Sequence, residues 1–357
     1  MRKGIANLPL HRGRAPRWLF SRMVKLARAM AEAMLEEFPP EEFLRRLSHP
    51  GWFQALGCVL GFDWHSSGLT TTTTAALKEA LAEISTPLIM AAGGKGATAR
   101  RTPEEVESLA ERFAFDPQPI IRASRITAKV DSVLLQDGYS IYHHTIFFTP
   151  DKKWAVIQQG MKEELRLARR YHYLSWEAED LTREPHTGIS SMRRENLVLD
   201  LTSRKSAENT ELVVQLSREN PGKITREFTR ILNMPRRHAL VSSDMKPKNL
   251  LRAMAKTYER APEDLLQLLT IKGIGAKFVR ALSLVADIVY GAPPSYEDPA
   301  LYSFAHGGKD RIPYPVDFEV YEKTIEVLER AIKSSKLGDR DKLKALRRLS
   351  REFSPGA

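Results

Sequence analysis

The chain has 357 residues, of which 42% are hydrophobic and 28% are charged, so it can bury a sizeable core in two or three domains. No uncharged apolar run has the length of a membrane span, and the arginine-rich start lacks the apolar segment of a signal peptide, which predicts a cytoplasmic protein. A single cysteine, Cys58, excludes an internal disulfide and a cysteine-rich zinc site. The 55 basic residues exceed the 44 acidic ones and give a net charge of +11, which favours a polyanionic partner such as DNA or RNA.

Residues 1–115 are predicted to form a helical N-terminal region. Apolar residues at helical spacing predict a helix over 16–38, which a double proline ends. The threonine run 70–74 offers N-cap hydroxyls to a second long helix. The glycines and lysine at 93–96 predict a flexible basic loop, and Thr102 is expected to cap the helix that follows it.

Residues 116–202 are predicted to form a β-meander plus a helix, the candidate catalytic region. Residues 133–136 and 139–148 are rich in β-branched and aromatic side chains, and the Asp-Gly pair between them predicts a tight hairpin. A third strand is expected over 154–159. The segment after it, which carries Arg166, Arg169 and Arg170, is predicted to be a helix.

Residues 203–357 are predicted to be helical and to bind DNA. Expected helices lie over 208–218, 223–234 and 248–259, with a closely spaced helical pair at 264–290 and two amphipathic helices at the end of the chain. The chain is therefore expected to be α+β and predominantly helical, with a central antiparallel β-meander, flanking helices and a helical C-terminal region.

The helical pair at 264–290 carries the strongest functional signal. Gly273 and Gly275 lack Cβ and can adopt positive φ, so they allow a tight turn whose backbone N–H groups face outward beside the second helix. Basic side chains that can add charge near a bound phosphate are Lys272, Lys277 and Arg280. The pattern resembles the helix-hairpin-helix motif of DNA-repair glycosylases, nucleases and recombination proteins, and the alternative is an ordinary helix end with a glycine cap. Such a motif implies DNA binding through the backbone with little sequence preference.

The central region is dense in imidazoles. A two-residue turn at Asp137-Gly138 pairs Asp131 with His144 across the hairpin, and pairing the ends of the second and third strands brings Gln158 beside His144. These three side chains are then expected to share one face. The candidate catalytic or metal-binding residues are Asp131, His143, His144, His172 and His186.

A carboxylate with several imidazoles suits more than one chemistry. It can bind a divalent metal ion that activates water, or it can act without metal by general acid–base catalysis. Both suit a nuclease, so the function expected first is a DNA-processing enzyme of repair or recombination that hydrolyses phosphodiester bonds. No fixed ligand spacing such as His-Glu-x-x-His identifies a metal. Each histidine can instead be a core residue hydrogen-bonded to a buried carboxylate.

Two other functions are compatible with the sequence. Bifunctional glycosylases of the helix-hairpin-helix superfamily place a catalytic lysine directly after the glycine turn and a catalytic aspartate roughly one helix later. Lys277 and Asp298 resemble this pair, although their separation is somewhat longer, and they would serve a DNA glycosylase or abasic-site lyase. Lys277 can also contact phosphate only, as in a non-enzymatic DNA-binding scaffold.

Several sequence blocks together resemble one family. They are Gly93-Gly94-Lys95-Gly96, Gln136-Asp137-Gly138-Tyr139, Tyr142-His143-His144, Gln158-Gln159-Gly160-Met161, Arg170-Tyr171-His172, Glu184-Pro185-His186, Arg237-His238 and the segment from Asp298-Pro299 to Lys309-Asp310. On these blocks the chain is similar, from about Leu8 to Leu349, to an archaeal and bacterial family called domain of unknown function 763. The resemblance implies no particular activity.

Overall fold

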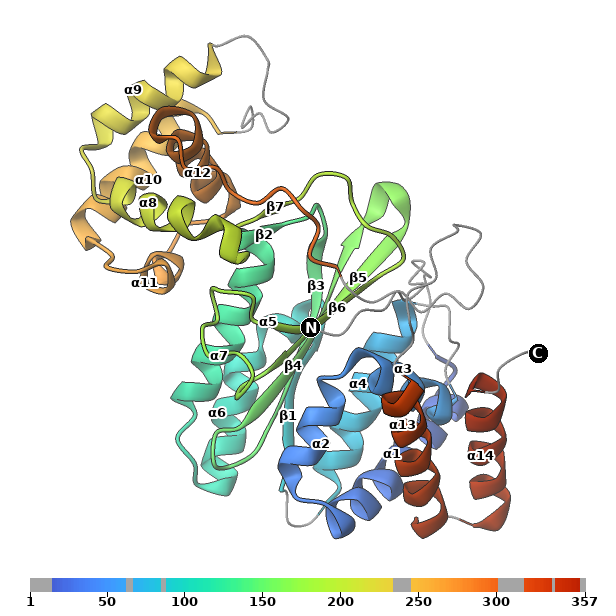
Figure 1. The fold of residues 1–357 in the computed structure, drawn as a ribbon. Coiled ribbons are helices and arrows are strands. Elements are labelled where there is room, and N and C mark those ends of the chain that lie inside the picture. The colour runs from blue at the N-terminus through green and yellow to red at the C-terminus, as the bar shows by residue number, and fades with distance from the viewer. Residues whose placement is uncertain are drawn as a thin grey trace.

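The centre of the molecule is a five-stranded antiparallel sheet, seen edge-on in the middle of the computed structural model in Figure 1. The structure describes residues 15–61, 67–84, 88–233, 245–300, 318–335 and 338–353. In spatial order the strands are β1 (Met90–Lys95), β3 (Ser140–Phe148), β4 (Trp154–Lys162), β5 (Leu167–Leu174) and β6 (His186–Ser191). A separate short pairing joins β2 (Leu135–Gln136) to β7 (Leu199–Asp200).

One face of the sheet is covered by helices from both ends of the chain. They are α1 (Arg17–Glu37), α2 (Pro40–Leu47), α3 (Pro50–Leu60), α4 (Ser67–Ala82), α13 (Phe318–Ser334) and α14 (Asp339–Phe353). Because side chains alternate along a strand, Phe147, Ala155 and Ile157 point to this face and enter the same buried core as these helices. No helix within the described ranges combines the length and the apolar character needed to cross a membrane.

The other face is covered by α6 (Thr102–Phe113) and α7 (Gln118–Lys129), which follow the short α5 (Ala97–Arg100). Ile146, Phe148 and Val156 point to this second face and form a second buried core with these helices. A π-helical segment, η1 (Val130–Leu134), continues α7 directly. Single 3₁₀ turns occur at η2 (Glu163–Leu165) and η3 (Arg204–Ser206).

A unit of five helices lies at one end of the sheet, at the upper left of Figure 1. Its members are α8 (Ala207–Ser217), α9 (Pro221–Leu232), α10 (Pro247–Arg260), α11 (Leu265–Thr270) and α12 (Ala276–Tyr290). Val130 and Leu134 of η1 belong to its buried core, so the unit is packed onto the end of α7. The helices α13 and α14, which the sequence grouped with this region, contribute instead to the core of α1 and α3.

The α+β class and the register of two central strands were correctly predicted. Phe148 lies opposite Trp154, and His144 lies opposite Gln158, as the sequence indicated. The expected helices also occur, with ends that differ by a few residues. The predicted helix after the third strand is wrong, because this segment is β5, in which Tyr171 and Tyr173 alternate with polar residues of the opposite face.

The predicted hairpin at Asp137-Gly138 is also wrong. The residues expected to form its first strand lie mostly in η1, and β3 pairs with β1 and β4. Asp137 is fully buried, and its carboxylate accepts hydrogen bonds from Arg169 and from the backbone N–H of Tyr139. Pairing of a buried charge therefore overrides the local turn preference of the Asp-Gly dipeptide.

Three local expectations near the N-terminus also need correction. Residues 93–95 of the basic glycine segment, predicted as a flexible loop, form the second half of β1, where Gly94 pairs with His144. The threonine run lies inside α4, which begins at Ser67, so these hydroxyls do not cap its start. Thr102 is the first residue of α6 and donates its hydroxyl to the carbonyl oxygen of Ala99.

Asn209 fixes the position of α8 against the end of α12. Its amide donates to the carbonyl oxygens of Ser283 and Ala292, at 3.1 and 2.7 Å, in a fully buried position. We predict that Asn209→Ala lowers the free energy of unfolding by about 2–3 kcal/mol, because two buried carbonyls lose their donor. Asn249→Ala, at an exposed position of α10, should change it by less than about 0.5 kcal/mol. Urea denaturation measures both, and equal losses would contradict the assignment.

Candidate functional site

Asp131 is the centre of a buried polar network on the α7 face of the sheet. Its carboxylate accepts a hydrogen bond from the hydroxyl of Tyr173 at 2.7 Å and lies 2.6 Å from Nε2 of His186. The amide of Gln158 donates to the second carboxylate oxygen and to the carbonyl oxygen of Thr127. The carboxylate is thus surrounded by protein donors, and only 1% of Asp131 is exposed.

His144 extends this network across β3. Its Nδ1 lies 2.8 Å from Oε1 of Gln158, and its Nε2 lies 2.8 Å from the hydroxyl of Ser124 on α7. Since an amide oxygen only accepts, Nδ1 donates to it, and in a neutral imidazole Nε2 then accepts from the hydroxyl of Ser124. Burial lowers the pKa of His144 and favours the same state. The prediction that Asp131, Gln158 and His144 share one face is correct, although η1 and not a hairpin strand delivers Asp131.

His143 and His172 lie on the opposite face of the sheet. Nε2 of His143 is 2.9 Å from the hydroxyl of Thr74 on α4, and burial lowers the pKa of His143 to about 3. Nδ1 of His172 donates to the carbonyl oxygen of Leu47, and its Nε2 accepts from Arg170 at 2.9 Å. Burial and the neighbouring guanidinium of Arg170 hold the pKa of His172 well below its usual range.

The five residues proposed as a catalytic site therefore do not converge. The sheet separates His143 and His172 from Asp131, His144 and His186, and each of the five is at most 7% exposed. Within the described residues, no group of three or more histidine, cysteine, aspartate or glutamate side chains is placed to hold a metal ion. The geometry resembles two largely hydrogen-bonded polar layers of a core, with Nδ1 of His143 buried without a hydrogen-bond partner, more than an open hydrolytic centre.

Asp298, the alternative catalytic aspartate, forms a buried ion pair with Arg169. Its two carboxylate oxygens accept from the guanidinium of Arg169 at 3.0 and 2.7 Å. The backbone N–H groups of Glu195 and Ala300 also donate to it, at 2.6 and 2.9 Å. Arg169 is fully buried and is shared with Asp137, so Asp298 joins the segment after α12 to the sheet.

The glycine turn between α11 and α12 has an exposed outer surface over a buried base. Gly273 has a φ of +92°, the left-handed region that favours glycine, whereas Gly275 is extended at a φ of −144°. Only the first glycine is therefore needed for its backbone freedom. Ile274 is buried in the core of the helical unit, and no side chain caps α12 at Gly275. Lys272 and Lys277 are exposed on either side of the turn.

Side chains from α7 and the strand that follows it hold this turn in place. The ammonium group of Lys129 donates to the carbonyl oxygen of Ile274 at 2.9 Å, and burial lowers the pKa of Lys129. The amide of Gln136 donates to the carbonyl oxygen of Ala276 at 3.1 Å. Both contacts occupy carbonyl oxygens, and within the turn the backbone N–H of Ile274 donates to the carbonyl oxygen of Ile271.

A row of basic side chains on α10 leads to the turn, a feature that the sequence reasoning missed. Its members are Lys248, Arg252, Lys256 and Arg260, all exposed and spaced four residues apart, which places them along one side of the helix. None of them forms an ion pair with a residue that the structure describes. The ammonium group of Lys256 would lie 3.3 Å from a Cβ built on Gly273, so the row passes beside the turn at its third member. The spacing was visible in the sequence.

The buried pair at Asp298 predicts a large effect on stability. Asp298→Asn should lower the free energy of unfolding by about 3–5 kcal/mol, because Arg169 then keeps an incompletely paired charge in the core. The neighbouring Glu297→Gln removes only an exposed ion pair with Lys205 and should cost less than about 1 kcal/mol. Urea denaturation of the two variants gives the comparison, and similar losses would show that the buried pair is not formed.

The lowered pKa of His143 predicts a dependence of stability on pH. In the folded state His143 stays neutral down to a pKa of about 3, whereas in the unfolded chain it takes up a proton near 6.5. Its contribution is therefore complete above pH 6.5 and is lost as the pH falls below that value. His143→Gln should make the fall in unfolding free energy between pH 6 and pH 4 shallower by about 1.4 kcal/mol per pH unit. Parallel curves for the two proteins would contradict this.

The comparisons with known proteins give one match. No curated protein and no solved structure matches the chain. The family described as "Protein of unknown function (DUF763)" matches residues 4–316, which include the sheet, the polar networks and the helical unit with its glycine turn. The chain belongs to this family.

Proposed function

We propose that the protein binds DNA through its phosphate backbone, using the turn between α11 and α12 together with α10. The observation that carries this proposal is the row of cations on α10, which have no ion-pair partner among the described residues and which pass beside Gly273 at Lys256. Cations that lack carboxylate partners and follow one helix favour a chain of phosphates over a single anion. Reading the turn as a helix-hairpin-helix is part of the same proposal.

The turn supplies a second type of phosphate contact. Backbone N–H groups at the start of a helix bind anions, and the start of α12 has no side-chain cap that would occupy them. The buried Ile274 and the contact from Lys129 fix the turn before any ligand arrives, so binding requires little ordering. These groups recognise phosphate and not base edges, which implies little sequence preference.

We propose DNA binding without a catalytic step. Hydrolysis was expected from Asp131 and the histidines, but their burial on two faces of the sheet gives that expectation no geometric support. Lyase chemistry was expected from Lys277 and Asp298, and the carboxylate of Asp298 is held by Arg169. Incubating nicked, duplex and abasic DNA with the protein and Mg²⁺, and with borohydride, tests both activities separately from binding.

We predict that the double variant Lys256→Glu with Lys272→Glu weakens binding of a fluorescein-labelled duplex at least tenfold at low salt. The reason is that two cations at the turn become repulsive towards phosphate. The single variant Lys272→Ala should reduce the slope of log affinity against log salt by about one. Fluorescence anisotropy over a range of salt concentrations measures both quantities, with duplexes of two unrelated sequences.

The double variant Lys344→Glu with Arg347→Glu is the matched control. Both residues are exposed on α14, which lies at the opposite end of the molecule from the turn in Figure 1, so their reversal changes the net charge as much as the double variant at the turn does. If this variant weakens binding as much as a reversal at the turn, only overall charge matters and the proposed interface is wrong. If the unaltered protein does not bind the duplex at low salt, the proposed function is wrong.

A further inference from the structure

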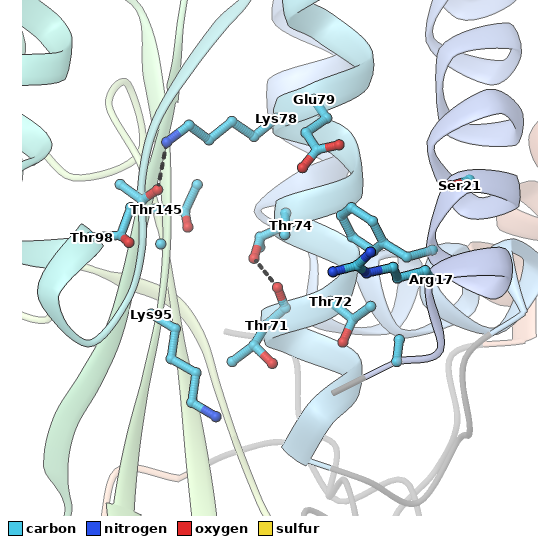
Figure 2. A pocket seen from close by; sticks show the side chains of 15 residues that line it. Arg17, Ser21, Thr71, Thr72, Thr74, Lys78, Glu79, Lys95, Thr98 and Thr145 are labelled. Atoms are coloured by element: carbon cyan, nitrogen blue, oxygen red, sulfur yellow. Dashed lines mark hydrogen bonds between the residues drawn. The ribbon is translucent and has the colours of Figure 1, made fainter. Parts of the chain in front are cut away.

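A second basic region lies far from the glycine turn, at the edge of the sheet formed by β1. It is a cavity of about 900 Å³ between β1, α4 and the first turns of α1. Figure 2 shows Arg17 and Ser21 on the α1 side, Thr71, Thr72 and Thr74 on α4, and Lys95 on the sheet side. The lining includes parts of the threonine run and of the basic glycine segment, two sequence features that the proposed DNA interface does not use.

The wall of the cavity is rich in hydroxyl groups and cations. Hydroxyl side chains come from α1, α4, β3 and α5, and the charged groups are Arg17, Lys78, Lys95 and Glu79. Lys78 is committed, because it pairs with Glu105 at 2.6 Å and donates to the carbonyl oxygen of Gly93 at 2.9 Å. Arg17 and Lys95 form no ion pair with any residue in the described part of the chain. Among the described residues, the wall therefore has two cations without a carboxylate partner, Arg17 and Lys95, and one carboxylate, that of Glu79.

Buried contacts hold the polar groups of the wall in place. The hydroxyls of Thr74 and Thr145 both contact Nε2 of His143, at 2.9 and 3.1 Å. β1 approaches β3 so closely that a Cβ on Gly93 would lie 2.3 Å from the carbonyl oxygen of His144. The glycine backbone consequently forms part of the wall without a side chain that would fill the cavity.

We propose that this cavity binds a nucleoside phosphate. Arg17 and Lys95 provide the charge that phosphate oxygens require, and the threonine hydroxyls can hydrogen-bond to both phosphate and sugar. Phe20, Ala15 and Ala75 add an apolar part to the wall, where the flat face of a base can pack. The phosphate comes either from a free nucleotide or from the phosphorylated end of a nucleic-acid strand, since both present the same chemistry.

The test uses the full chain and four probes: ATP, AMP, inorganic phosphate and a 5′-phosphorylated single-stranded hexanucleotide. Isothermal titration calorimetry should detect binding of ATP or of the hexanucleotide, and that binding should weaken at least tenfold in Lys95→Glu. Lys95 is exposed, so this variant should fold, and its melting curve by circular dichroism checks that it does. Ala75→Trp, which fills the cavity with an uncharged side chain, should also reduce binding.

Two controls separate this cavity from other sources of binding. Arg100→Glu makes the same charge change at an exposed residue of α5 that does not line the cavity, and it should leave binding unchanged. Lys272→Glu, at the glycine turn, should leave ATP binding unchanged, so failure of the DNA proposal and failure of this one remain distinguishable. Binding of ATP alone assigns a free nucleotide, and binding of the hexanucleotide alone assigns a strand end. The inference is overturned if no probe binds or if Lys95→Glu binds as well as the unaltered protein.

Discussion

The guanidinium of Arg169, buried between the carboxylates of Asp137 and Asp298, connects the parts of this fold that are distant in sequence. It links the residues before β3, the middle of β5 and the segment that leaves the helical unit. A buried cation needs both partners, so the pairing draws Asp137 into the core and prevents the hairpin that its sequence favours. The same pairing accounts for the position of Asp298, which the sequence alone offered as a catalytic residue.

A sheet covered by helices on both faces needs hydrogen-bond partners for most of the polar groups that it buries. Here two imidazoles are satisfied as neutral groups, by Ser124 and Gln158 for His144 and by Leu47 and Arg170 for His172, whereas Nδ1 of His143 is buried without a partner. Asp131 completes its layer by accepting from Tyr173 and Gln158. These contacts explain why so many polar residues occur in the strands without forming an open site.

Much of this architecture could be predicted from local patterns. Helical spacing located the helices, and alternation located β3 and β4 with the correct pairing of His144 and Gln158. The wrong hairpin at Asp137 and the wrong helix at Arg169 have one cause. Both residues were interpreted by their local preferences, whereas Arg169 pairs with Asp137 and with Asp298, which is 129 residues away in the chain. The basic row on α10 was missed for a different reason. Its spacing was visible in the sequence, but its proximity to Gly273 depends on tertiary packing. Within the candidate site, the sequence indicated the turn with its flanking lysines and the face shared by Asp131, Gln158 and His144, but not that His186 joins this face.

The central claim is that backbone binding resides at the turn after α11 and along α10, and not at the histidine-rich sheet. Hydrogen–deuterium exchange of the full chain, with and without a saturating DNA duplex, tests this most directly because it locates the contact without any substitution. The account predicts slower exchange in peptides that cover residues 248–260 and 271–280, with the peptides of β3 to β6 unchanged. Protection confined to the sheet, or to surfaces remote from Gly273, would contradict it.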